Sequence, residues 1–353
     1  MALINPPLPE AYYYAGETAT ILQSHAIPWR SGGTKKLLIS CDPGRLEWNT
    51  VMGPMTDPSS RGDLWIYDYA STGDVQRVLL DGYPLHADFH PLAPQIIPST
   101  AHEPATLFVI NHGRVNTTIE VFHLTDTAPY TATYVRTLSH RAFVSLNSIA
   151  AVSRTTFYVT NDHAVTRRLP IFGAFLSLLE TFLRIPSTWV DRVDLVGSDI
   201  RITRVANLAF ANGIAVSPTR KKLWWPLRHR TNDLTYRSVV PVPFAPDNVA
   251  YDEEDGSIIV AGHPHFYSLI RVAAKETDTA PSWVTEISAT KASTNDSTAP
   301  YPAVSRAPVV SSHAVNTLYQ SNGSHYSSSS TGVRVGKDLF VAGLYADGIL
   351  HCK

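Results

Sequence analysis

Four short polar motifs, each placed where a β-like run gives way to a turn, constrain the fold of this chain more than any other feature. They read TNDH (160–163), FANG (210–213), PDNVAYD (246–252) and AGHPH (261–265). The motifs are spread over about 100 residues, so we expect their amide and carboxylate oxygens to meet only if distant strand ends share an axis. A β-propeller builds calcium sites on its axis from such oxygens.

Short β-like runs recur along the chain, many of them bounded by Gly, Pro, Asp or Asn. They cover residues 35–40, 63–69, 106–112, 117–124, 155–161, 201–206, 213–217, 221–225, 257–263 and 338–344. Many short strands separated by turns predict a sandwich, barrel or propeller. A short sequence motif, in which an Asn is followed closely by apolar residues, recurs as LNSIAAV, ANGIAVS and DNVAYD. This recurrence indicates repeated blades. We therefore predict an all-β chain in which residues 1–353 form a single domain.

Two segments depart from this pattern. Residues 169–190 carry apolar side chains at helical spacing, with Gly173 and Pro186 around the best part, and predict a helix. Inserted after the TNDH strand, this helix would be either a surface helix packed by its apolar face or a lid over an axial pocket that also touches lipid. Residues 288–331 are rich in Ser, Thr, Ala and Pro and predict a long loop.

Composition excludes some classes of function. The net charge is −1 with no basic block, which argues against nucleic acid as a partner. Hydrophobic residues make up 44% of the chain and charged residues 17%, so a large core is expected. No apolar run reaches the length of a membrane-spanning helix. The expected partners are small apolar substrates, and the expected state is a monomer or dimer.

The route of the protein through the cell is left open by the sequence. The first residues, MALINPPLPEAYYY, lack the basic and apolar regions of a signal peptide. Three glycosylation sequons, at Asn116, Asn295 and Asn322, favour a secretory route if a leader has been removed. Without such a leader, the protein is expected in the cytoplasm.

The two cysteines lie near opposite ends of the chain, at Cys41 and Cys352. A propeller closes its ring by pairing strands from both ends, which could bring these residues together. A disulfide there would close a loop of nearly the whole chain, with about 5 kcal/mol of stabilisation in the chain-entropy model. We predict this disulfide; the alternative is two unrelated buried thiols.

In order and spacing, the motifs resemble the paraoxonase/arylesterase family, calcium-dependent phosphotriesterase-type propellers that hydrolyse lactones and aryl esters. Three longer stretches carry the same resemblance: INHGRVNTTIEVF (110–122), FYVTNDH (157–163) and GKDLFVAGLYADGILHC (336–352). The resemblance extends from about residue 20 to the end of the chain. It implies a six-bladed β-propeller with an inserted lid helix at 169–190.

The resemblance also implies a set of calcium ligands. In the family, a Glu, two Asn residues and an Asp–Asn pair hold the catalytic calcium. The counterparts of the last four are Asn161, Asn212, Asp247 and Asn248. Asp162 matches a ligand of the family's second, structural calcium. Asn and Asp before turns also commonly bond their own backbone. The match is therefore evidence of common ancestry, and it does not by itself imply a bound metal.

The family's Glu has no counterpart here. Residues 22–41 contain no acid, and Ser24 and His25 fall near the expected place. Asp42 follows the strand and could substitute only if the register shifts. Asp247 is then the only carboxylate in the catalytic set, and calcium affinity follows the charge of the ligands. We therefore expect no required cofactor, with calcium possible.

The catalytic histidines of the family are also altered. Its water-activating His belongs to an F-x-P-H-G motif, which here reads FHPLAP (89–94). Leu92 stands in place of that His, and His90 lies two residues earlier. His112 keeps the position of the assisting His, and His263 matches a further His of the pocket. A core histidine bonded to backbone is the alternative for either of these two.

An intact scaffold with altered hydrolytic residues predicts a non-hydrolytic enzyme. The chain resembles fungal hetero-Diels–Alderases, which join an o-quinone methide from a tropolone or phenolic precursor to a humulene-type terpene. Such a cycloaddition needs two partners held in near-attack geometry and water excluded. The alternatives are a calcium-dependent lactonase or arylesterase and a non-catalytic binder of a hydrophobic molecule.

Specific residues are assigned to this predicted axial pocket. The candidate donors to a substrate carbonyl are His112, His263, Asn161, Asn212 and Asn248. The candidate pocket residues are Ser24, His25, Leu92, Phe210, Phe175, Leu179 and Phe182.

Overall fold

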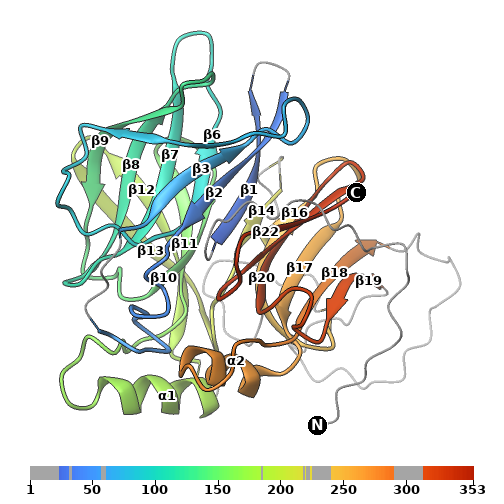
Figure 1. The fold of residues 1–353 in the computed structure, drawn as a ribbon. Helices are drawn as coiled ribbons and strands as arrows, with labels where there is room; N and C mark the ends of the chain where they lie inside the picture. The colour runs from blue at the N-terminus through green and yellow to red at the C-terminus, as the bar shows by residue number, and fades with distance from the viewer. Residues whose placement is uncertain are drawn as a thin grey trace, which may run out of the picture.

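A computed structural model describes most of the chain. The described residues are 24–31, 34–56, 61–183, 186–217, 219, 223–224, 240–289 and 313–353. They form six sheets that follow one another along the chain, together with two short helices (Figure 1). Neighbouring strands within each sheet are antiparallel, except that β5 lies parallel to β9.

The first three sheets contain four or five strands each. Sheet I consists of β1 (Ser24–Ser31), β2 (Thr34–Cys41), β3 (Asp63–Tyr67) and β4 (Val75–Arg77). Sheet II consists of β6 (Pro91–Ile97), β7 (Ala105–His112), β8 (Thr117–Leu124) and β9 (Thr131–Leu138), with β5 (Leu79–Asp81) at its edge. Sheet III consists of β10 (Leu146–Ala151), β11 (Thr156–Asn161), β12 (Thr188–Val196) and β13 (Asp199–Leu208).

The remaining sheets complete the series. Sheet IV has two strands in the described residues, β14 (Ala215–Val216) and β15 (Leu223–Trp224). Sheet V consists of β16 (Ala245–Tyr251), β17 (Ile258–His263), β18 (Ser282–Ala289) and β19 (His313–Ser321). Sheet VI consists of β20 (Ser329–Val335), β21 (Asp338–Gly343) and β22 (Ile349–Cys352).

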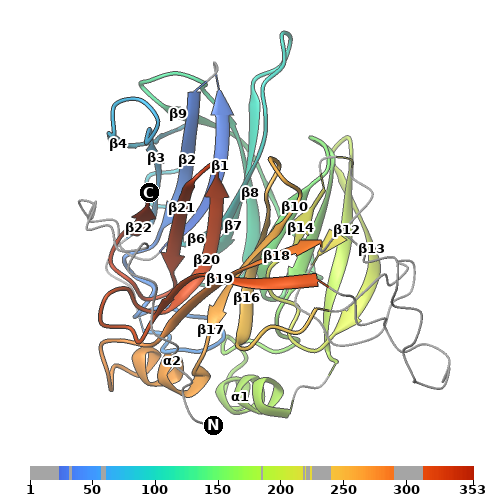
Figure 2. The same cartoon turned by 90° about the vertical axis from the view of Figure 1, so that its right-hand side faces the viewer.

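The six sheets form a closed ring, seen from two directions in Figures 1 and 2. The first strand of each sheet packs against a strand of the next sheet, and β20 of sheet VI packs against β1 of sheet I. The predicted β-propeller is therefore confirmed. Five of its sheets have three or more strands, and sheet IV contributes the two-stranded pair.

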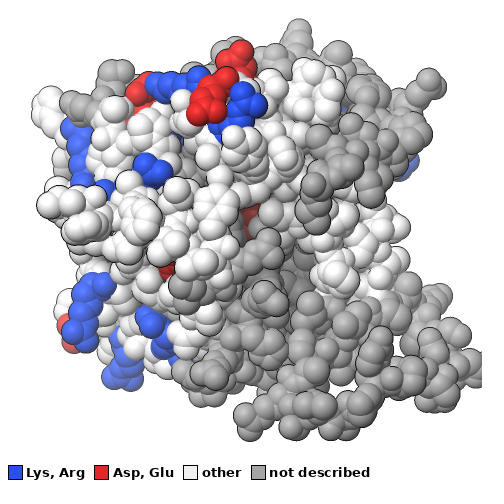
Figure 3. Space-filling model, turned by 90° about the horizontal axis from the view of Figure 1, so that it is seen from below, with Lys and Arg blue, Asp and Glu red and all other residues white. Residues whose placement is uncertain are grey.

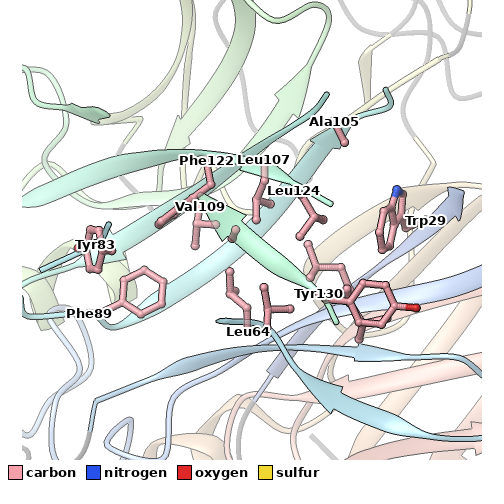
Figure 4. Close-up of a cluster of buried hydrophobic side chains, with 14 residues drawn as sticks. Trp29, Leu64, Tyr83, Phe89, Ala105, Leu107, Val109, Phe122, Leu124 and Tyr130 are labelled. Atoms are coloured by element: carbon pink, nitrogen blue, oxygen red, sulfur yellow. The ribbon is translucent and has the colours of Figure 1, made fainter. Parts of the chain in front are cut away.

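The hydrophobic core is divided into layers between adjacent sheets. In β7 every residue is buried, because its alternate side chains pack on two different neighbours. Leu107 and Val109 belong to the layer shared with sheet I, which Figure 4 shows from inside. Phe108 and Ile110 belong to the layer shared with sheet III. A continuous apolar run in such a strand thus holds three sheets together.

Most predicted strands are found close to their expected bounds, but the predicted loop at 288–331 is partly wrong. Residues 313–321 form β19, and β20 begins at Ser329. Polar Ser and Thr side chains suit these strands because the middle of β19 is exposed and because the buried serines of β20 find hydrogen-bond partners. Residues 290–312 lie outside the described part of the chain.

The predicted helix is shorter than expected, and a second helix was missed. Helix α1 covers Gly173–Leu183, whereas residues 188–190 already belong to β12. Helix α2 covers Phe266–Ala273 and follows the AGHPH motif directly. Both helices lie at the same end of the ring (Figure 1). No helix among the described residues is long and apolar enough to cross a membrane.

Helix α1 packs by its small and polar side. Gly173 and Ser177 are its buried residues, and Ser177 Oγ donates to Val51 O at 2.9 Å. Glu180 accepts hydrogen bonds from the backbone N–H groups of Ala164 and Val165. Apart from half-buried Leu176, the large apolar residues in the helix and just before it are exposed instead: Leu169, Ile171, Phe172, Phe175, Leu178, Leu179, Phe182 and Leu183. The expectation of a helix packed by its apolar face is therefore wrong.

The predicted disulfide is also wrong. Cys41 and Cys352 are both buried thiols that are not joined to each other. Cys41 packs in the layer between sheets I and VI, whereas Cys352 packs in the layer between sheets V and VI. The ring is closed by packing of β20 on β1, so no covalent bond is needed to hold the two ends. Burial raises the pKa of Cys41 to about 12 and that of Cys352 to about 11.

Two of the three sequons can be placed. Asn116 and Asn322 are exposed, as glycosylation requires, and Asn295 lies outside the described residues. Modification at these sites stays a prediction.

Removal of one interior aromatic ring tests the layered core. Phe108 is fully buried and lies 5.0 Å from Phe157 between ring centroids. Phe108→Ala should lower the free energy of unfolding by about 3–5 kcal/mol, because it opens a cavity between sheets II and III. The matched control is Phe175→Ala on α1, where the ring is 63% exposed, and a change within about 0.5 kcal/mol is expected. Equal effects of the two changes in urea unfolding would contradict this packing.

Candidate axial site

Irregularities at the start of the inner strands direct polar side chains to the axis. The register of β10 shifts between Leu146 and Ser148, and that of β20 shifts between Ser329 and Thr331. In β16 the shift lies between Pro246 and Val249, which sets Asp247 and Asn248 outside the regular ladder. Such bulges bend a strand and redirect the extra residue. In two of the three recurring sequences, LNSIAAV and DNVAYD, the Asn therefore lies at a bulged strand start.

A glycine brings two of the motifs together. At Gly213 a Cβ atom would lie only 2.5 Å from Cα of Asn248, so no other residue fits this close approach. The N–H of Gly213 also donates to Asp247 O at 2.9 Å. Phe210 begins the same turn with a φ of 64°, a left-handed conformation that is costly for an aromatic residue. The turn thereby places Asn212 beside the Asp247–Asn248 pair.

Asp247 and Asn248 lie between two histidines. His263 Nε2 donates to Asp247 Oδ2 at 3.0 Å. Asn248 Nδ2 contacts His25 Nε2 at 2.8 Å, Asp247 Oδ1 at 3.2 Å and Ser330 O at 3.0 Å. All of these side chains are buried. The cluster thus joins the inner ends of sheets I, V and VI by hydrogen bonds.

His25 occupies this cluster as a neutral ring. Burial lowers its pKa to about 4, with a smaller contribution in the same direction from the charge of Arg45. A neutral imidazole can accept the hydrogen bond from Asn248 at Nε2. The position that the family resemblance assigns to a carboxylate is therefore held by an uncharged acceptor.

A buried ion pair beside the cluster was missed by the sequence analysis. Arg45 Nη2 lies 3.1 Å from Asp42 Oδ2, and both side chains are almost fully buried. His90 Nδ1 lies 3.2 Å from both oxygens of Asp42, while its Nε2 faces Asp88 at 3.2 Å. Although burial opposes it, Arg45 and His90 hold the pKa of Asp42 below its usual range. Asp42 and Arg45 lie in the DPGR turn after β2, a sequence that predicts a turn but does not predict burial of the pair.

His112 has both ring nitrogens engaged. Its Nε2 donates to Leu146 O at 2.6 Å, and Arg45 Nη1 lies 3.5 Å from its Nδ1. Burial lowers its pKa to about 3, and the charges of Arg45 and Arg168 act in the same direction. His112 is therefore a neutral link between sheets II and III, with little capacity to act as a base near neutral pH.

The side chains of Asn161 and Asp162 accept hydrogen bonds from residues of nearby turns and strands. Asn161 Oδ1 accepts from the backbone N–H groups of Val144 and Ser145, at 2.9 and 3.1 Å. Asp162 Oδ2 accepts from Asn147 Nδ2 at 3.2 Å. Among the described polar atoms, Asn161 Nδ2, Asn147 Oδ1 and Asn212 Oδ1 are buried without a hydrogen-bond partner. Such atoms are costly unless a ligand or water meets them.

The remaining predicted pocket residues are dispersed. Leu92 packs in the apolar layer between sheets II and III, and a role in lining a pocket stays a prediction. Phe175, Leu179 and Phe182 lie on the exposed side of α1, contrary to the predicted lid, because the polar side of the helix packs on the propeller. Phe210 is half-buried against His163, 5.4 Å between ring centroids. The side chain of Ser24 lies outside the described part of the structure.

The donors of the axial cluster do not fit a tightly held calcium ion. Of the four calcium-type residues, Asp247 alone carries charge, and both of its oxygens accept hydrogen bonds. Asn161 gives its oxygen to backbone N–H groups, whereas Asn212 Oδ1 is buried without a hydrogen-bond partner. Within the described residues, no three His, Cys, Asp or Glu side chains group closely enough to hold a metal ion. Calcium prefers six or more oxygens with several negative charges.

The neutral state of His112 predicts a specific pH dependence of stability. The unfolded chain takes up a proton at this residue near pH 6.5, whereas the folded protein does so only near pH 3. The stabilisation is therefore complete above pH 6.5 and is lost as the pH falls. Between pH 7 and pH 5, wild type should lose about 2 kcal/mol more unfolding free energy than His112→Gln. Parallel losses in the two proteins, measured by urea unfolding, would contradict the assignment.

Comparisons with known proteins agree with the fold and the motifs. The profile of the arylesterase family matches residues 53–353. Serum paraoxonase/arylesterase 2 of Canis lupus familiaris is 28% identical over 169 residues, 45% of this chain and 45% of that protein. The human protein of the same name is 29% identical over an equal length and equal shares. Serum paraoxonase/lactonase 3 of Rattus norvegicus is 27% identical over 174 residues, 46% of each chain. The chain spans about half the length of these relatives.

A solved structure supports the fold alone. The PQQ-bound aldose sugar dehydrogenase of Streptomyces coelicolor superimposes with a TM-score of 0.51 over 96% of this chain and 97% of that one, at 13% identity. The match of the family profile to most of the chain, together with the motifs assembled on the axis, leads to one conclusion. The chain belongs to the arylesterase family.

Proposed function

We propose that the axial site hydrolyses small apolar esters or lactones, with His263 as the base. The observation that carries the proposal is the His263–Asp247 contact of 3.0 Å. With Nε2–H donating to Asp247, the lone pair of His263 lies on Nδ1, which is buried and has no hydrogen-bond partner. A histidine held by a carboxylate on one nitrogen and available on the other suits a general base. Membership in a family of hydrolytic enzymes supports the same reaction class.

The proposed step moves one proton at His263 Nδ1. This nitrogen takes a proton from water as the water oxygen attacks the substrate carbonyl, and Asp247 stabilises the imidazolium that forms. Asn161 Nδ2, which is buried without a hydrogen-bond partner, is the candidate donor to the carbonyl oxygen as it becomes negative. Collapse of the tetrahedral intermediate breaks the C–O bond, and the leaving alkoxide takes the proton back from Nδ1.

A second candidate is the bond-forming cyclisation of an o-quinone methide with an apolar terpene. It is favoured by the state of the other histidine positions. Leu92 is part of the apolar core, His90 faces two carboxylates, and both nitrogens of His112 are engaged. A cycloaddition draws on orientation and exclusion of water and requires no base. The remaining alternative is a site that binds a hydrophobic molecule without turnover.

Substitution of the dyad tests the hydrolytic proposal. His263→Gln and Asp247→Asn should each lower ester or lactone turnover by about 10² to 10³, because general-base catalysis is lost. The matched control is His265→Gln, which removes a ring that bonds Ser268 Oγ and packs against Tyr267 at the start of α2, and turnover should persist. Turnover by wild type should also persist in excess chelator, since no step uses a metal.

Two results would reject hydrolysis in favour of the alternatives. If wild type turns over neither aryl esters nor lactones, but changes the rate or stereoisomer ratio of a quinone-methide cyclisation, the second candidate is correct. If neither reaction responds but an apolar ligand binds, the site is a binding site. Unchanged hydrolysis in His263→Gln would remove His263 from its proposed role.

We also propose that the exposed apolar side of α1 contacts lipid. The large apolar residues of this helix are exposed, and the described middle of the same end of the molecule is largely free of charged residues (Figure 3). Exposed patches of this kind mark interaction surfaces, and lipid accepts an amphipathic helix by its apolar face.

Vesicle binding tests the lipid contact. Replacement of Phe175, Leu179 and Phe182 by Ser should reduce co-flotation with phosphatidylcholine vesicles about tenfold or more, because about 25 cal/mol is lost for each Å² of apolar contact. The control replaces three exposed apolar residues elsewhere, Leu79, Leu85 and Val115, and should float like wild type. Equal flotation of the two triple variants would contradict the assignment to α1.

A further inference from the structure

We propose that the guanidinium of Arg45 is the resident cation of the axial site and takes the place of the family's catalytic calcium. The proposal concerns the charge held at the axis and does not depend on which reaction the site performs. It rests on the contacts of Arg45, on the titratable groups that its charge affects, and on the oxygen ligands that a calcium ion would need.

Three contacts fix Arg45 at the inner ends of the strands. Its Nη2 lies 3.1 Å from Asp42 Oδ2 and donates to Pro91 O at 3.2 Å, at the start of β6. Its Nη1 lies 3.5 Å from His112 Nδ1, at the end of β7. The backbone turn is closed by Arg45 N donating to Asp42 O. Arg45 is only 4% exposed, so its charge acts in a medium of low polarity.

The partners of the ion pair hold it in place. Asp42 is held by the N–H of Gly44 at 3.1 Å and by His90, whose far nitrogen faces Asp88. The ring of His90 also stacks on Trp48 at 6.1 Å between centroids. A buried arginine is tolerated when a carboxylate pairs with it and its other donors are used. Arg45 meets these conditions: it pairs with Asp42, which is bonded through His90 to Asp88, and its other donors face Pro91 O and His112.

The charge of Arg45 reaches the groups around the axis. It lowers the pKa of His112 and of His25, in each case acting with burial, and it also acts on buried Tyr345. His25 and Tyr345 in turn feel the charge of Asp247. Arg45 and Asp247 therefore share two neighbours, one of which contacts Asn248. By geometry, Arg45 contacts His112, whose Nε2 donates to Leu146 O, and Leu146 pairs with the calcium-type residue Asn161 between β10 and β11.

The same neighbourhood is unfavourable for calcium in two ways. The oxygens of Asp247 and Asn161 are already committed to hydrogen bonds. The NH₂ group of Asn248 has its donors directed at His25, Asp247 and the carbonyl of Ser330. A divalent ion entering here would break these bonds and meet the like charge of Arg45. The network thus replaces ion coordination by hydrogen bonds and a covalently held positive charge.

Calcium binding gives the first test, with no need for a substrate. Isothermal titration of wild-type protein with calcium chloride should give no binding with a Kd below about 1 mM, and calcium should not shift the Tm relative to chelator. A Kd in the micromolar range, or a rise in Tm that chelator reverses, would overturn the proposal.

The charge of Arg45 gives the second test. NMR titration of labelled histidines should show the pKa of His112 about one unit or more higher in Arg45→Met than in Arg45→Lys, because Lys keeps the positive charge. Arg45→Met leaves Asp42 buried without its partner and can unfold the protein. The double variant Asp42→Asn with Arg45→Met removes both charges and should show a rise in the same direction, smaller than in Arg45→Met because the opposing field of Asp42 is lost as well.

His112 is a suitable reporter because its charged neighbours are known. They are Arg45, Arg168 and Asp162. Equal pKa values of His112 in Arg45→Lys and in the double variant would overturn the proposal, because the field at the axis would then not come from Arg45. Neither test measures turnover, so failure here is distinct from failure of the proposed hydrolysis.

Discussion

Packing of β20 on β1 closes the ring, and the axial site depends on that contact. It buries an apolar layer between sheets I and VI. It also brings His25 of the first described strand to Asn248 of sheet V, whose amide donates to Ser330 O of sheet VI. Groups more than 200 residues apart in the chain thereby share hydrogen bonds. Without closure these buried polar groups would lose their partners, which is costly.

Bulges at the inner strand starts turn this closed ring into a site. A regular strand would send alternate side chains into the two neighbouring apolar layers, as β7 does. The register shifts in β10, β16 and β20 free Asn147, Asp247, Asn248 and Ser330 from that alternation. The close approach at Gly213 adds Asn212. The site is then filled by hydrogen bonds, a His–Asp contact and the Arg45–Asp42 ion pair, with neutral His25 and His112 at its edges.

The sequence predicted the architecture well because alternation and turn residues are local signals. It also identified three polar motifs whose residues contact one another, FANG, PDNVAYD and AGHPH. It failed where a residue's role depends on which side chain faces it. Leu92 was assigned to the pocket because the family has a histidine there; it packs in an interior layer, and a role in the pocket stays a prediction. The apolar spacing of α1 predicted burial, but the helix packs through Ser177 and Glu180. Arg45 was overlooked because a lone arginine in a turn carries no local sign of burial.

The central claim is that a guanidinium and a hydrogen-bond network occupy the place of a metal ion. The most direct measurement is a crystal structure of the protein grown in millimolar calcium chloride. The account predicts Arg45 Nη2 within hydrogen-bond distance of Asp42, Asn248 Nδ2 directed at His25, and no cation at the axis. A calcium ion coordinated by Asn212, Asp247 and Asn248, with Arg45 displaced, would contradict it.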